Sequence, residues 1–152
     1  MATRSRIAIE NADGTFTSVY CHWDGYPSHN GQILFDCYNT HAEVRELLSH
    51  GDLSVLGPKI GAGHDFDARD TDDQCTFFKR DRGEDDVDAA KSANYIALCG
   101  LTRECGGEWL YVFGRDGVWR VAQGGTAWFG GPADDAPGGL RLLEDVLNKV
   151  DA

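Results

Sequence analysis

Two Asp-Gly turns constrain the fold of this chain more than any other feature of its sequence. The first lies within residues 11–14, between the apolar stretch 6–10 and the β-branched and aromatic stretch 16–23. The second lies within residues 114–117, and it too is flanked by stretches rich in aromatic and β-branched residues. Asp-Gly supplies the positive φ angles that a tight hairpin turn needs, and the flanking residues favour strands. The sequence therefore predicts two β-hairpins.

Apolar residues at helical spacing predict helices beside the two hairpins. The best-defined helix begins at Thr40, which forms a capping box with Glu43, and it ends at Gly51. The remaining stretches are assigned as follows: helices over 28–38 and from 139 onward, a short helical turn and loop over 52–63, a strand over 75–78, and either a helix or a buried strand over 92–105.

These elements predict a single α+β domain that spans residues 1–152. Its sheet is expected to be antiparallel and built mainly from the two hairpins, with helices packed on one side. A chain of 152 residues, 41% of them hydrophobic, is long and apolar enough to bury a core.

Net charge and cysteine usage narrow the possible settings and partners. The formal net charge is −11, which repels phosphate backbones and anionic membranes, so direct binding to nucleic acid or to a membrane surface is not expected. The same charge either keeps the chain in solution or lets it mimic nucleic acid in the basic groove of a partner. The five cysteines include no C-x-x-C pair, and no apolar run is long enough for a signal peptide or a membrane span. We therefore expect free thiols and a cytoplasmic location.

The segment 20–31 concentrates side chains suited to a binding or catalytic site. It contains His22, Trp23, Asp24 and Tyr26 at the predicted end of a strand, just before a predicted helix. On a continuing strand His22 and Asp24 would share a face, and such a pair can move a proton or orient a ligand. Two interpretations stay open: a site, or a structural corner in which the rings pack and the carboxylate caps the turn.

A strongly acidic segment, 64–88, holds ten acidic residues against four basic ones. Within it, His64 and Asp67 are candidate ligands for a divalent metal, although the spacing does not match a calcium-binding loop. Arg80 and Arg82 flank Asp81, and two such guanidinium groups can hold a phosphate or carboxylate. The alternative is a solvated surface network of ion pairs.

The stretches 3–10 and 19–27, which include the letters TRS and YCHWDGYP, resemble a family of short uncharacterised proteins of bacteriophages, prophages and bacterial genomes. The resemblance continues to about residue 85 through HDFD at 64–67 and RDRGE at 80–84. It brings no activity that can be transferred to residues. It implies a mobile genetic element, a setting in which many small proteins bind and blunt host defence proteins.

Three functional hypotheses follow. The first is a non-enzymatic, acidic, phage-type binding protein that occupies a host protein or sequesters a small anionic ligand. The second is a small enzyme acting on a phosphorylated or nucleotide-like substrate, with the His22–Asp24 pair, an arginine clamp and no identified cofactor beyond the candidate metal. The third is a structural or assembly role. The chain has no nucleotide-binding glycine loop, nucleophile elbow or zinc-protease motif, so the enzyme is the less favoured interpretation.

Overall fold

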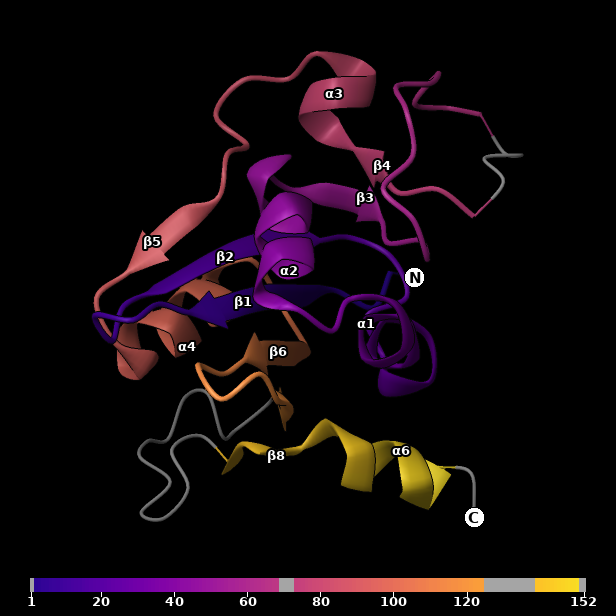
Figure 1. Ribbon diagram of the computed structural model, residues 1–152. Helices are drawn as coiled ribbons and strands as arrows, with labels where there is room; N and C mark the ends of the chain where they lie inside the picture. Colours follow the sequence, from indigo (N-terminus) through magenta and orange to yellow (C-terminus); the bar gives the residue numbers. More distant parts are fainter. Residues whose placement is uncertain (1, 69–72, 125–138, 151–152) are drawn as a thin grey trace.

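A computed structural model describes residues 2–68, 73–124 and 139–150 of the chain. It contains one mixed sheet in the order β4-β3-β2-β1-β6-β7-β8, with β5 pairing with β2 (Figure 1). The strands are β1 (Ser5–Glu10), β2 (Phe16–Cys21), β3 (Leu53–Val55), β4 (Thr76–Phe77), β5 (Ala90–Ser92), β6 (Trp109–Phe113), β7 (Trp119–Gln123) and β8 (Arg141–Leu142). The helices are the π-helical turn η1 (Pro27–Gly31), α1 (Gln32–Cys37), α2 (His41–Ser49), α3 (Phe78–Arg82), α4 (Tyr95–Glu104) and α6 (Leu143–Val150).

Both predicted hairpins are confirmed. Strands β1 and β2 pair antiparallel from Ser5 opposite Cys21 to Glu10 opposite Phe16, and β6 pairs with β7 in the same manner. The turns are wider than the two-residue form, because five residues separate the last pair of each hairpin. Within each Asp-Gly step only the glycine has a positive φ, 87° at Gly14 and 76° at Gly117.

The α+β class is confirmed, but the sheet is mixed rather than purely antiparallel. Strand β1 lies parallel to β6, and β2 lies parallel to β3. Hairpin signals in a sequence specify only the pairing of neighbouring strands. How the two hairpins join is decided by which apolar faces meet, and here their inner strands β1 and β6 lie side by side.

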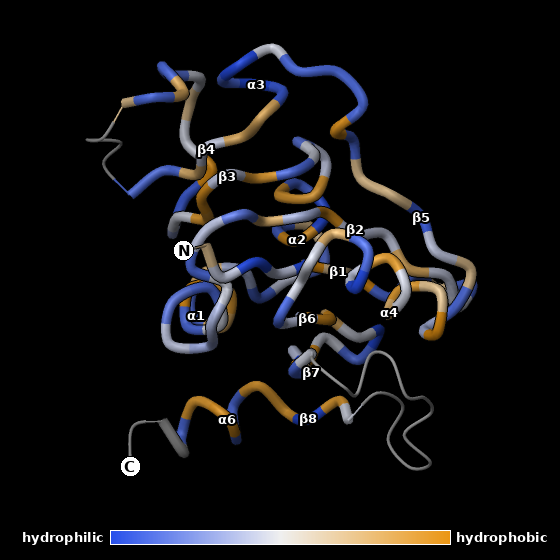
Figure 2. Tube along the Cα trace, turned by 180° about the vertical axis from the view of Figure 1, so that it is seen from behind, coloured by the Kyte–Doolittle hydropathy of each residue, from blue (hydrophilic) through white to orange (hydrophobic). Residues whose placement is uncertain are grey.

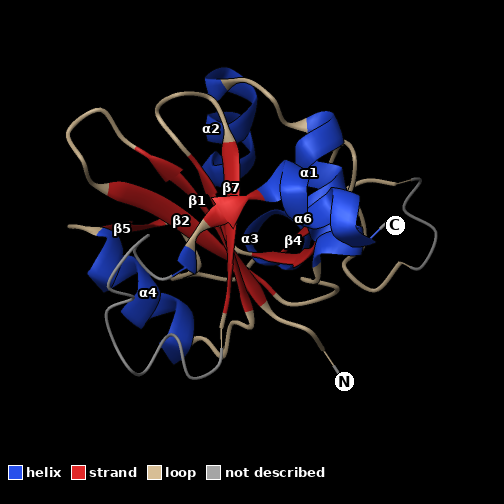
Figure 3. Ribbon diagram, turned by 90° about the horizontal axis from the view of Figure 1, so that it is seen from below, coloured by secondary structure: helices blue, strands red, loops and turns tan. Residues whose placement is uncertain are grey.

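Helices cover both faces of the sheet, whereas the sequence predicted helices on one side. Helices α1, α2 and α6 lie over one face, and α4 lies over the other (Figure 3). The reason is visible in the central strands: Ile7 and Ile9 point into the larger core, while Ala8 points into a second apolar cluster with Phe16 and Leu98. A central strand that is apolar on both faces needs cover on both.

The other elements agree with the sequence to differing degrees. Helix α2 begins at the predicted capping box, in which Thr40 and Glu43 each satisfy a backbone N–H of the other. The ambiguous stretch 92–105 is mainly the helix α4. The helical turn expected within 52–63 is wrong, because residues 53–55 form β3, which lies between β2 and the edge strand β4. No helix in the described ranges has the length and apolar character that crossing a membrane requires.

Candidate functional site

The chain makes a tightly held corner where β2 ends. The amide of His22 donates to the Leu53 carbonyl and that of Trp23 to the Ser54 carbonyl, both at 3.0 Å, so the segment still follows β3. Asp24 then takes a left-handed conformation with φ 55°, which is uncommon for a residue other than glycine. The chain leaves the sheet at this point and enters the π-helical turn η1. Backbone outliers and π-helical turns of this kind occur frequently at functional sites.

Buried polar groups hold this corner from beneath. The Asn30 side chain is fully buried, and its amide nitrogen lies 3.2 Å from Ser5 Oγ, 3.4 Å from Cys21 Sγ and 3.5 Å from the Trp23 carbonyl. From β6, the Tyr111 hydroxyl donates to the Gly25 carbonyl at 2.5 Å. These contacts fix the backbone that carries the exposed side chains.

Position 25 requires glycine because neighbouring atoms lie too close for a Cβ, and not because its φ is positive. Its amide donates to the Thr3 carbonyl at 2.8 Å. A Cβ added at Gly25 would lie 2.7 Å from Ser5 Cβ and 2.9 Å from the Thr3 carbonyl oxygen. The corner therefore packs directly against the start of β1.

Above this scaffold lie five rings, which we call the aromatic corner: Tyr20, His22, Trp23, Tyr26 and His29. Trp23 is 40% exposed and Tyr26 is 39% exposed, so two large aromatic side chains lie open to solvent close together in the sequence. The rings contact one another edge to face, His22 with Trp23 at 4.8 Å and Tyr26 with His29 at 6.2 Å between centroids. Such contacts restrict the rings while their outer faces stay open to a partner.

His22 is part of a different pair from the one predicted. Its Nδ1 lies 2.6 Å from the Tyr20 hydroxyl, and among the described contacts no hydrogen bond or ion pair joins it to Asp24. The Asp24 carboxylate instead accepts from the Tyr26 hydroxyl at 3.5 Å. The left-handed backbone at Asp24 explains the difference, because the two-residue alternation of a strand ends there.

An arginine that the sequence analysis did not select lies beside the aromatic corner. Burial lowers the pKa of His22, and the positive charge of Arg4 lowers it further. Continuing the β1–β2 register by one pair places Arg4 opposite His22. Counting back from the hairpin turn would have found this neighbour, since the register follows from the turn.

The guanidinium of Arg80 donates its hydrogen bonds to acceptors within the protein and is not directed at an anion. Its guanidinium donates to the carbonyls of Ile60, Gly61 and Cys75 at 2.9, 3.1 and 2.9 Å, and its Nε donates to Asp81 at 2.9 Å. The Asp81 side chain is fully buried. Burial alone would raise the pKa of Asp81, but the hydrogen bonds from Arg80 and from backbone amides lower it overall.

Arg82 likewise has partners in its own neighbourhood. Its Nε donates to Glu84 at 2.6 Å, and its guanidinium lies over the rings of Phe66 and Phe78, 4.2 and 5.3 Å from their centroids. In the described residues no hydrogen bond, ion pair or ring contact joins Arg80, Asp81 or Arg82 to the aromatic corner. The structure thus places the two halves of the predicted composite site in separate networks.

Both ring nitrogens of His64 have partners within the protein. Its Nδ1 lies 2.9 Å from the Asp65 carbonyl and its Nε2 lies 3.1 Å from the Cys75 carbonyl. Carbonyl oxygens only accept, so these two contacts favour the ring protonated on both nitrogens, and Thr76 Oγ1 also lies 3.4 Å from Nε2. Asp67 accepts no bond from this ring; its own amide donates to Asp65. Within the described parts of the chain, no three His, Cys, Asp or Glu side chains are grouped as a metal site would require.

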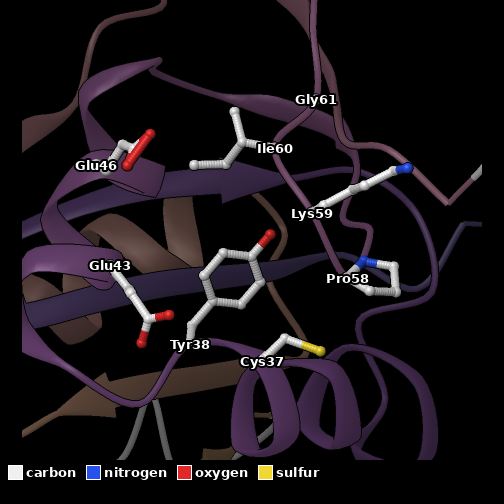
Figure 4. Close-up of a pocket in the computed structure, with 8 residues that line it drawn as sticks. All are labelled: Cys37, Tyr38, Glu43, Glu46, Pro58, Lys59, Ile60 and Gly61. Carbon is white, nitrogen blue, oxygen red and sulfur yellow. The ribbon is translucent and has the colours of Figure 1, made fainter.

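A surface pocket of about 340 Å³ lies between the α1–α2 connection and the segment 58–61 (Figure 4). Two of its polar side chains already serve the fold. The Tyr38 hydroxyl donates to the Gly57 carbonyl at 2.8 Å, and the Glu43 carboxylate completes the cap of α2. Burial raises the pKa of the Cys37 thiol in its wall, and the nearby carboxylates raise it further, so this cysteine is a poor nucleophile.

Comparison with known proteins adds no assignment. No family model matches the chain, and neither the curated proteins nor the solved structures give a match. The resemblance to short phage and prophage proteins therefore stays a prediction.

Proposed function

We propose that this chain is a small acidic binding protein that occupies a partner protein through its aromatic corner. The observation that carries the proposal is the exposure of Trp23 and Tyr26 on a backbone fixed by buried hydrogen bonds. Tryptophan and tyrosine are the residues most enriched among those that dominate binding energy at protein interfaces. Rigid placement also lowers the entropic cost of binding.

The setting of the proposal comes from the sequence. The resemblance to phage and prophage proteins makes a host defence protein in the cytoplasm the class of partner that we propose. The net charge of −11 supports a partner with a basic surface, because opposite charges speed association and orient the encounter.

The enzyme hypothesis has less support from the same geometry. An Arg80–Arg82 clamp would need guanidinium donors directed at a substrate, whereas those of Arg80 are taken by three carbonyls and a carboxylate. A His22–Asp24 pair would need a hydrogen bond between the two side chains, whereas His22 contacts Tyr20.

The test compares Trp23→Ala and Tyr26→Ala with the intact chain. The immobilised protein is incubated with lysate of a host cell, the captured protein is identified and purified, and its Kd is measured by calorimetry. Each substitution is expected to cost about 2 kcal/mol of binding free energy, roughly a thirty-fold rise in Kd. Both side chains are exposed, so the far-UV circular dichroism should not change.

The matched control is Ile96→Ala on α4, because Ile96 is 80% exposed yet lies outside the aromatic corner. This variant should keep the wild-type Kd. Equal affinity of Trp23→Ala, Tyr26→Ala and the wild type would contradict the proposal. A thermal-shift screen with nucleotides tests whether the chain instead sequesters a small anionic ligand. A ligand bound at the aromatic corner should raise Tm in the wild type and not in Trp23→Ala.

A further inference from the structure

The orientation of a buried amide fixes how His29 presents its ring in the aromatic corner. The amide nitrogen of the fully buried Asn30 faces Ser5 Oγ at 3.2 Å and the Trp23 carbonyl at 3.5 Å. A carbonyl oxygen only accepts, so the amide nitrogen belongs on that side and the amide oxygen on the other. That oxygen lies 2.9 Å from His29 Nδ1 and also only accepts, so Nδ1 carries a proton. A neutral His29 ring therefore has its lone pair on Nε2.

A second acceptor lies beside the same tyrosine ring. The side-chain oxygens of Asp24 accept, among the described residues, only from the Tyr26 hydroxyl, and at 3.5 Å this contact is close to the limit for a hydrogen bond. The Tyr26 ring in turn contacts the His29 ring at 6.2 Å between centroids. A carboxylate and an imidazole nitrogen thus flank a ring that is itself exposed.

Both acceptors are open to solvent. Asp24 and His29 are half-buried residues, and neither the second carboxylate oxygen nor Nε2 has a hydrogen-bond partner in the described part of the chain. Over the same residues, Tyr95 Oη is the only buried side-chain nitrogen or oxygen atom without a partner. The unpartnered atoms of Asp24 and His29 are therefore not buried, and a group from outside can reach them.

No cation of the chain pairs with Asp24 in the residues that the structure describes. Arg4, the positive charge beside His22, lies at the turn between α4 and β6, because its Nη1 would be 3.0 Å from a Cβ added at Gly106. The carboxylate of Asp24 is thus left for a cation that comes from another molecule. The net charge of −11 favours the approach of such a group.

We propose that the aromatic corner holds an arginine side chain of its partner protein over the Tyr26 ring. The planar guanidinium stacks on the aromatic face, and its N–H donors bond the Asp24 carboxylate and His29 Nε2. A lysine ammonium has neither the plane nor the fork of donors, so it matches this arrangement less well. The inference rests on the proposed function and deepens it, because it names the group that the aromatic corner binds.

The first test uses three short peptides and needs no partner protein. A tripeptide with a central arginine between two glycines, blocked at both ends, is compared with the lysine peptide and with the peptide of citrulline, the uncharged isostere of arginine. Each is titrated at about pH 8, where imidazoles are mostly neutral. The backbone amide signals of Tyr26 and His29 in a proton–nitrogen NMR spectrum report binding.

A saturable shift of these two signals is expected with the arginine peptide, a weaker response with lysine and none with citrulline. No response to arginine, or an equal response to citrulline, would overturn the inference. A response to lysine as large as that to arginine would overturn the assignment to a guanidinium group.

The decisive variant is Asp24→Asn, because asparagine also tolerates the left-handed backbone at this position, φ 55°, while the charge is removed. Its Kd for the arginine peptide should rise about five-fold. Asp86→Asn is the matched control, since Asp86 has a similar φ of 59°. It belongs to the loop after α3, which is strongly hydrophilic and lies at the β4 end of the sheet, apart from α1 and the start of the chain (Figure 2). This control should keep the wild-type Kd, and an unchanged Kd in Asp24→Asn would sink the proposal.

A second pair of variants tests the ring. Tyr26→Ala should raise the Kd for the arginine peptide about five-fold, whereas Tyr26→Phe keeps an aromatic face and should bind like the wild type. The inference and the proposed function fail on different results. Unchanged affinity for the partner protein in Trp23→Ala and Tyr26→Ala would contradict the proposed function. Lost affinity for the partner in those variants, with an unchanged Kd for the peptide in Asp24→Asn, would overturn the arginine assignment alone.

Discussion

At the scale of single residues, the chemistry of this chain depends on which groups surround each charge. Asp81 was predicted as part of an anion clamp, yet it is the buried acceptor that organises Arg80, the Phe77 amide and the His64 amide. His64 lies beside the same carboxylate, with Nε2 3.6 Å from Asp81. Its two carbonyl partners favour the protonated ring, so His64 links this network to pH.

The carbonyls of Cys75 and Asp65 raise the pKa of His64 above its ordinary value of 6.5. Asp81 raises it further, while burial and the charge of Arg80 oppose the rise. A raised pKa in the folded state means that the stabilisation is fully present below pH 6.5 and is lost as pH rises through the folded value.

We therefore expect the free energy of unfolding of the wild type to fall, relative to that of His64→Gln, by roughly 1 kcal/mol between pH 6 and pH 8.5. Urea unfolding of both proteins at four pH values measures this difference in the free energy of unfolding. The contribution of His22, whose lowered pKa acts with the opposite sign, is common to both proteins and cancels. Parallel pH profiles of the two proteins would show that the protonated ring does not stabilise the fold.

At the scale of elements, the sequence predicted a helix correctly where side chains beside its start bond the free backbone N–H groups of its first turn. Helix α2 has a capping box, and its start was predicted from Thr40 and Glu43 alone. Helix α4 also has a cap, since Asn94 accepts from the Ala97 amide at 2.8 Å. Its interior contains Gly100, which weakens a helix.

Gly100→Ala should stabilise the protein. Gly100 lies inside α4, has no positive φ, and an added Cβ meets nothing within 4 Å. Alanine is more favourable than glycine in a helix interior by about 0.5–1 kcal/mol. Urea unfolding at one pH measures the gain, and Gly25→Ala is the opposite control, because its Cβ would meet Ser5 and should destabilise the fold. A loss of stability in Gly100→Ala would mean that this face of α4 is in contact with something.

At the scale of the whole molecule, the parallel pairing of β1 with β6 joins the two hairpins. Its register runs from Ser5 opposite Trp109 to Ile9 opposite Phe113, so it connects parts of the chain about a hundred residues apart. Both cores share this joint, because Ile7 and Tyr111 face the larger one and Ala8 and Val112 face the other.

Unfolding should therefore be a single cooperative transition. Three of the four tryptophans lie in the described residues, so fluorescence reports on the aromatic corner through Trp23 and on the second hairpin through Trp109 and Trp119. Far-UV circular dichroism reports on all helices and strands. In urea the two signals should give the same midpoint and the same slope. Two separated transitions would show that the hairpins belong to independent folding units.

The sequence by itself determined the features that neighbouring residues specify. These are the two hairpins with their glycine turns, the capped helix α2, and the selection of His22, Trp23, Asp24 and Tyr26 as an unusual corner. Each is set by backbone sterics and hydrogen bonds within a few residues, so each can be predicted without the rest of the chain.

Only the tertiary structure decided which of these groups meet. The parallel β1–β6 joint, the cover of α4 on the second face, and the engagement of Arg80 by Asp81 and three carbonyls all depend on contacts between distant segments. A sequence states the type of a side chain and its local direction. Whether that side chain finds a partner depends on how separate apolar faces pack together.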